Sequence, residues 1–131
     1  MMRSRSPLPD MHYESHRSVE SRACQGVRFR VRRLSLTRRM ELIRLIRETG
    51  EKLAFHQAGE SVVDAAHAAE IRSRMDALYI RWGLDEITGM TIDGEPVSMD
   101  NLMERGPDSL AREIVEAVKG ELFLDEDERK N

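Results

Sequence analysis

Apolar and polar residues alternate strictly after residue 26, in the pattern of a β-strand with one buried face. Val27, Phe29 and Val31 are separated by arginines at positions 28, 30 and 32. Because successive side chains of a strand point to opposite faces, this pattern predicts a core-facing apolar side and an outer basic side. We therefore expect a strand over residues 27–32.

Two helices are predicted next, because the apolar spacing changes to three and four residues. Ser35 or Thr37 caps the first helix, Glu60 or Ser61 begins the second, and glycines at positions 59 and 83 end them. The positions expected to face the core are Leu36, Met40, Ile43, Ile46, Gly50 and Leu53 in the first helix, and Ala68, Ile71, Met75, Leu78, Tyr79 and Trp82 in the second. Two antiparallel helices of about 20 residues make a hairpin about 30 Å long.

The stretch that follows carries the strongest turn signal in the chain. Asp93-Gly94 lies between alternating apolar positions and favours a two-residue hairpin, because both central residues of such a turn need positive φ. We expect strands at residues 87–92 and 95–98 to form one sheet with residues 27–32. The strand at 95–98 should lie at an edge or be very short, because Pro96 cannot donate a ladder hydrogen bond. Ser98 then caps a short helix, and Pro107 begins a last helix. The buried stripe of the last helix is predicted to contain Leu110, Ile114, Ala117, Val118 and Leu122.

These elements predict one mainly helical α+β domain at residues 27–124, with a helical hairpin and a C-terminal helix packed with a small antiparallel β-ribbon. Residues 1–26 have no apolar periodicity, so we expect a disordered N-terminal leader. Because the first element begins abruptly at Val27, one hypothesis is that the native chain starts there. Residues 125–131 are charged and predicted to fray.

Composition indicates a thin aliphatic core under a charged surface. Of the 131 residues, 34% are charged and only 5% are aromatic. The net charge of -3 is unevenly distributed, since residues 1–50 carry +7 and residues 51–131 carry -10. A single cysteine, Cys24, cannot form an internal disulfide, and no apolar run is long enough to span a bilayer. We therefore expect a cytoplasmic protein of a bacterial-type cell.

Few residues fall in patterns that carry chemistry. Asp64, His67 and Glu70 recur at spacings of three, and such residues can share a metal ion when a facing helix supplies further ligands. Only His56 and Glu60 are candidates for those ligands, so a capping Asp64 beside a boundary histidine is the favoured interpretation. The sequence also has no nucleophile elbow and no phosphate-cradling glycine loop. We predict a protein that is not an enzyme and uses no metal or cofactor.

Six arginines in the basic half form a candidate phosphate-binding surface. They are Arg28, Arg30, Arg32, Arg33, Arg38 and Arg39. A small arginine-rich nucleic-acid-binding regulator would place them against phosphates, and this is the alternative function. No aromatic residues are interleaved on the strand face to stack on bases, so a charged edge that discourages strand-to-strand aggregation is the favoured interpretation.

Residues 82–118 resemble the tail assembly chaperones of long-tailed bacteriophages and prophages, small proteins encoded just before the tape-measure protein. The similar features are Trp82-Gly83-Leu84 at a helix end, Asp93-Gly94 followed by Glu95-Pro96-Val97-Ser98, Leu102 before Gly106-Pro107, and Leu110, Glu113-Ile114 and Ala117-Val118 in the last helix. The resemblance transfers no catalytic residue, because the family has none.

What the resemblance implies is a protein that binds the tape-measure protein, keeps its long amphipathic helices soluble and hands them over as tail-tube subunits polymerise. This task needs a surface that covers apolar helix faces, either shallow or shared between the subunits of a homo-oligomer. The residues expected to contribute are Phe55, Met75, Tyr79, Trp82, Met99 and Met103. The alternative is that these side chains form the core of the domain itself.

Overall fold

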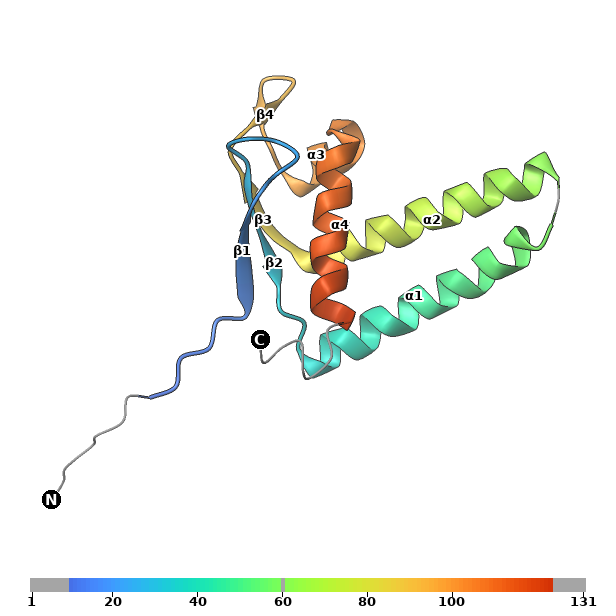
Figure 1. Cartoon of the computed structure of the whole chain (residues 1–131), viewed down its shortest axis with the longest axis horizontal. Helices are drawn as coiled ribbons and strands as arrows, with labels where there is room; N and C mark the ends of the chain where they lie inside the picture. The colour runs from blue at the N-terminus through green and yellow to red at the C-terminus, as the bar shows by residue number, and fades with distance from the viewer. Residues whose placement is uncertain (1–9, 60, 124–131) are drawn as a thin grey trace, which may run out of the picture.

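The computed structural model describes residues 10–59 and 61–123, and a pair of helices projects from its body (Figure 1). The body contains a sheet of β1 (His16–Glu20), β2 (Arg28–Arg32) and β3 (Leu84–Thr88). The projecting pair consists of α1 (Leu36–Gln57) and α2 (Val62–Gly83). After β3 come β4 (Thr91–Ile92), β5 (Glu95–Pro96), α3 (Met99–Arg105) and α4 (Asp108–Phe123). The prediction of a mainly helical α+β fold is confirmed.

The sheet is antiparallel in the order β1-β2-β3, and the predicted strand at residues 27–32 is confirmed as β2. The Asp93-Gly94 turn is also confirmed, with φ of 50° and 82° at its two residues. The prediction that both strands of this hairpin join the sheet of β2 is confirmed for residues 87–88, which belong to β3, and is wrong for residues 91–92 and 95–96. Gly89, with φ of 104°, turns the chain after β3, so that β4 and β5 form a separate two-stranded ribbon.

Strand β1 lies within the segment that we expected to be disordered, and this expectation is wrong for residues 16–20. The strand pairs with β2 from His16 opposite Arg32 to Glu20 opposite Arg28. On α4, Glu121 accepts a hydrogen bond of 2.8 Å from Arg17 Nε. The ordered fold therefore begins before Val27. Residues 1–9 of the predicted leader and the predicted tail at 125–131 lie outside the described residues.

The core lies where α4 crosses the sheet and the body end of α2 (Figure 1). Its fully buried side chains include Phe29 and Val31 of β2 and Ile114 and Val118 of α4. The predicted stripe of α4 is confirmed at residues 110, 114, 118 and 122, whereas residue 117 is half-buried and residue 115, which the stripe omitted, is buried. A small core shared by α4, the sheet and α2 therefore holds the body together.

The predicted helix starts are confirmed by their capping hydrogen bonds. The hydroxyl groups of Ser35, Ser61 and Ser98 each accept a hydrogen bond from the backbone N–H three residues further on. At the start of α3 the side chain of Asn101 also accepts from the N–H of Ser98, which completes a capping box. These local contacts fix where each helix begins, independently of its packing.

Glu113 of α4 holds the loop between β1 and β2. Its carboxylate accepts hydrogen bonds from Ser21 Oγ (2.6 Å) and from the backbone N–H groups of Arg22 (2.7 Å) and Ala23 (3.4 Å). Burial raises the pKa of this carboxyl, but the hydrogen bonds together outweigh burial, and the net pKa of Glu113 is lowered. The fold therefore favours the charged form.

Replacing Glu113 by glutamine is expected to reduce the free energy of unfolding by about 1 kcal/mol at pH 7, because the loop loses a charged acceptor. A lowered folded-state pKa contributes stability above the unfolded pKa of about 4.3 and loses it as the pH falls through the folded value. The difference between wild type and variant should therefore vanish in acid. Urea unfolding of both proteins at pH 7 and in acid measures this difference in the free energy of unfolding. Glu116→Gln, on the exposed side of α4, is the control, and an equal loss there would contradict the loop-anchor role.

Candidate partner-binding arm

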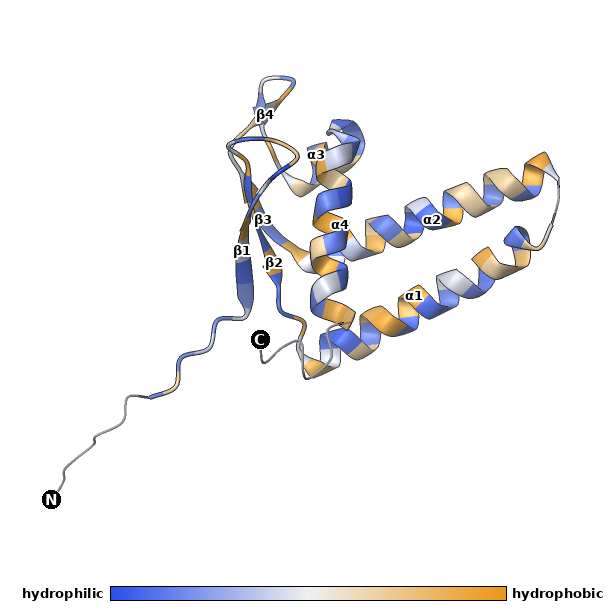
Figure 2. Cartoon of the chain, in the orientation of Figure 1, coloured by the Kyte–Doolittle hydropathy of each residue, from blue (hydrophilic) through white to orange (hydrophobic). Residues whose placement is uncertain are grey.

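Helices α1 and α2 form an antiparallel arm that projects from the body (Figure 1). Each helix has 22 residues and is therefore about 33 Å long. Helix α1 packs chiefly on α2, whereas α2 also contacts α3, α4 and the sheet. Figure 2 shows apolar positions along both helices and at the end of α2 that meets the turn. Much of this apolar surface has no counterpart in the body to cover it.

The tip of the arm carries three exposed apolar side chains, and we use the name tip for these three residues. Phe55, in the last turn of α1, is 74% exposed, while Val62 and Val63, in the first turn of α2, are 86% and 64% exposed. The cap at Ser61 fixes where α2 begins. Because neighbouring residues of a helix point about 100° apart, the two valines cannot both face α1. The tip is therefore an apolar surface open to solvent.

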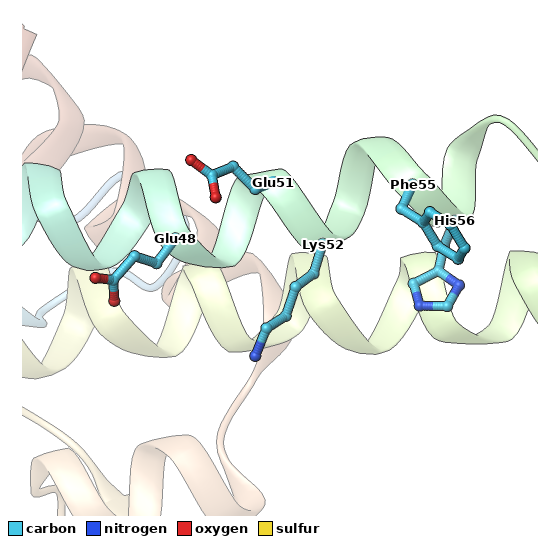
Figure 3. A pocket seen from close by; sticks show the side chains of 5 residues that line it. All are labelled: Glu48, Glu51, Lys52, Phe55 and His56. Atoms are coloured by element: carbon cyan, nitrogen blue, oxygen red, sulfur yellow. The ribbon is translucent and has the colours of Figure 1, made fainter.

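A hollow of about 550 Å³ runs along α1 beside the tip (Figure 3). It is lined by Glu48, Glu51, Lys52, Phe55 and His56. In Figure 3 the two carboxylates lie toward the body end and the ring of Phe55 toward the turn. The hollow thus combines the aromatic ring of Phe55 with two carboxylates and with Lys52, which lies between them in Figure 3. It suits a helix that carries an apolar side chain flanked by charged residues.

The outer side of α1 near the body is also apolar, and here the predicted core stripe is wrong. Leu36, Met40 and Ile43 are 74%, 64% and 40% exposed. Leu42 is the buried residue of this helix, and Ile46 packs half-buried against the core. Helix α1 thus has two apolar faces, of which the described chain covers one.

Asp64, His67 and Glu70 do not converge on a metal site. Asp64 accepts from the Ser61 hydroxyl at 2.9 Å and lies 3.3 Å from His56 Nδ1, and these contacts lower the pKa of Asp64. Glu70 instead binds an arginine one turn further along, while the rings of His56 and His67 stack with centroids 4.7 Å apart. Within residues 10–59 and 61–123, no three His, Cys, Asp or Glu side chains are placed to hold a metal ion. Asp64 thus contacts the cap residue Ser61, and the contacts of His56 with Asp64 and His67 join the two helices near the tip.

The arginines of β2 lie opposite carboxylates of the neighbouring strands. Arg28 pairs with Glu20 of β1 at 2.6 Å, and both Arg30 and Arg32 pair with Asp85 of β3 at 2.8 and 3.3 Å. The outer face of the sheet is therefore close to charge balance. A nucleic-acid phosphate would have to displace these carboxylates, which fits the charged-edge interpretation better than a phosphate-binding surface.

The other three candidate arginines are engaged with the backbone. Arg33, Arg38 and Arg39 each donate a hydrogen bond to a carbonyl oxygen of the chain. The guanidinium of Arg38 also lies over the ring of Trp82, 4.7 Å from its centroid. The structure thus distributes the six arginines over several local contacts and does not gather them into one free basic surface.

The structure does not bring the six predicted partner-binding residues together. They are Phe55, Met75, Tyr79, Trp82, Met99 and Met103. Only Phe55 is largely exposed, and Tyr79 is a core residue that is 4% exposed. The methionines and Trp82 are half-buried, with Met99 and Met103 packed against the core from α3. Apart from Phe55, these residues therefore serve mainly to pack the body and the base of the arm.

Comparison with known proteins identifies no relative. No family model, curated protein or solved structure matches the chain. Among the described residues, no helix combines the length and the apolar character needed to cross a membrane.

The tip valines were not singled out from the sequence, although a signal was present. Val62 and Val63 directly follow a capping serine, and two adjacent apolar residues in a first helical turn cannot both be covered by one partner helix. No comparable pattern in the sequence indicates that Leu36 is exposed. Its spacing to Met40 and Ile43 is that of any core-facing stripe.

Proposed function

We propose that this protein is a non-enzymatic phage tail assembly chaperone that binds amphipathic helices of the tape-measure protein and keeps them soluble. The arm is the binding element, and tail-tube subunits take over the client as the tube forms. The observation that carries the proposal is the exposed apolar tip at the end of the projecting helical pair. The resemblance of residues 82–118 to this class of chaperone supplies the identity of the client.

The chemistry of the arm suits a helical client. An amphipathic helix presents an apolar stripe flanked by charged residues. The tip offers apolar contact, and the neighbouring hollow offers the carboxylates of Glu48 and Glu51 to cationic flanking residues. Glu48 already accepts a hydrogen bond of 2.8 Å from Arg44, whereas no ion pair of Glu51 occurs among the described residues. Glu51 is thus the carboxylate available to a client.

Co-expression with a fragment of the tape-measure protein encoded downstream tests the proposal. The wild-type chain should increase the soluble fraction of the fragment, and the variant Phe55→Ser/Val62→Ser/Val63→Ser should lose most of this effect, because the apolar contact is removed. The matched control is Met11→Ser/Tyr13→Ser, which removes two exposed apolar side chains outside the arm. Soluble client and co-purification with it are the measurements.

Two results would contradict this function. One is an unchanged soluble fraction of the client with the tip variant, provided that the variant retains the thermal stability of the wild type. The other is retention of the wild-type chain on a DNA column with a steep dependence on salt, which would support the nucleic-acid-binding alternative.

A further inference from the structure

One face of α1 has the residue spacing of a coiled coil and is left open. It comprises Leu36, Met40, Ile43, Arg47, Gly50 and Ala54, which we call the seam. The alternating spacings of four and three residues are those of the heptad repeat, which keeps one helix in contact with another along its length. Leu36 and Met40 are mostly exposed. A Cβ added at Gly50 would meet nothing within 4 Å.

We infer that two copies of this chain associate through the seam, with α1 of one copy antiparallel to α1 of the other. The large apolar residues lie in the first half of the seam and the small ones in the second half. A twofold axis beside residue 45 sets Leu36 opposite Ala54 of the second copy and Met40 opposite Gly50 of the second copy. Large side chains then meet small ones at both ends, as a self-complementary twofold interface requires.

The central layer explains why the second copy runs antiparallel. In that register Ile43 lies opposite Arg47 of the second copy, whose apolar stem can cover the isoleucine while its guanidinium reaches the rim. A parallel pair would set Arg47 against Arg47 and leave a gap between two glycines at position 50. Only the antiparallel arrangement avoids both the charge repulsion and the void.

The gradient in side-chain size also favours a second copy over an unrelated helix. A foreign helix would need small residues opposite Leu36 and Met40 and large ones opposite Gly50, whereas this chain supplies both. The seam and the tip share no residue, and Phe55 points about 100° around α1 from Ala54 of the seam. The inference is therefore independent of the client that the tip binds.

The first test is the mass of the purified full chain in solution, measured by sedimentation over a range of concentrations. We expect a dimer, and we expect Gly50→Leu to weaken dimerisation at least tenfold because the leucine meets Met40 of the second copy. The same variant should not lower the melting temperature of the monomer, since leucine favours a helix more than glycine does and the space beside Gly50 is open.

A compensating variant distinguishes a specific interface from non-specific hydrophobic association. Met40→Ala combined with Gly50→Leu exchanges the large and small positions within the same layer. Dimerisation should recover to within about threefold of the wild type, because large again meets small. Recovery is not expected if Gly50→Leu acts by distorting α1.

Cross-linking reports the orientation of the two helices. In a Cys24→Ser background, the variant Leu36→Cys/Ala54→Cys should form a covalent dimer under mild oxidation. The two positions are about 27 Å apart along one helix, so no disulfide can form within a chain. Leu36→Cys alone should stay uncross-linked, whereas a parallel pair would cross-link it.

Three results would overturn the inference. They are a wild-type chain that stays monomeric at about 1 mM, a dimer that Gly50→Leu leaves intact, and efficient cross-linking by Leu36→Cys alone. Each measurement is made without a client, so none depends on the proposed function. Conversely, a tip variant that loses client binding but still forms the dimer would show that the seam acts independently of the tip.

Discussion

Replacing Phe29 by alanine is expected to lower the free energy of unfolding by about 3–5 kcal/mol. Phe29 lies in the central strand β2, opposite Val19 of β1 and Ile87 of β3, and its side chain is 1% exposed. Phe29 is the largest of the fully buried side chains, so its truncation leaves a large cavity in a small core. A small domain of typical stability would be left only marginally folded.

Phe55→Ala is the matched control, because it removes the same side chain from the tip of the arm, where it is 74% exposed. Its free energy of unfolding should stay within about 0.5 kcal/mol of the wild type. Urea unfolding followed by circular dichroism measures both variants. A loss at position 55 comparable to that at position 29 would mean that the tip is packed and not open, and would also remove the structural basis for client binding.

The parts of the fold that local chemistry determines could be predicted from the sequence. Ser35, Ser61 and Ser98 cap helices where they were expected to, and the Asp93-Gly94 turn has positive φ at both residues. These signals involve residues within a few positions of each other, so they do not depend on how the chain packs. Strand β2 could also be predicted, because a strand with one buried face and one solvent-exposed face has strictly alternating apolar and polar residues.

Strand β1 could not be predicted, because its residues carry no pattern of their own. The sequence of β1 has one apolar residue, Val19, among polar neighbours. What makes it a strand is pairing with β2 and the contact of Arg17 with α4. Both partners are distant in sequence, and an edge strand with one covered position leaves no period to detect.

The candidate site was predicted only in part, because periodicity finds apolar faces without saying what covers them. Helix α1 has two such faces, one containing Leu42 and the other Leu36 and Met40, and the sequence favoured the wrong one as the core. In α2, Tyr79 was predicted both to face the core and to contribute to partner binding, and the structure places it in the core. Only tertiary packing decides between these faces.

The apolar residues at the base of the arm are packed, whereas others on the arm are exposed. Tyr79 and the methionines of α3 pack at the base of the arm, where α2 meets α3, α4 and the sheet. The exposed apolar residues instead lie at the tip and on the uncovered face of α1 that contains Leu36 and Met40. Changes in the packed base are therefore expected to affect stability, and changes in these exposed residues to affect association.

The crossing of α2 and α4 at this base depends on Gly83, and Gly83→Ala is expected to cost about 2–3 kcal/mol of stability. A Cβ at position 83 would overlap the side chain of Val118, whose own Cβ would be 2.9 Å away. Val118 is fully buried and β-branched, so it cannot swing aside. The helices would have to separate, and β3 would shift with them because it follows Gly83 directly.

Gly120→Ala provides the control, because it makes the same substitution in α4 where an added Cβ meets nothing within 4 Å. Alanine is the better helix former, so this variant should gain up to about 1 kcal/mol. Thermal and urea unfolding of the two variants should therefore shift in opposite directions from the wild type. If both gained stability, the helices would be free to move apart at no cost, and the rigid junction that holds the arm on the body would not exist.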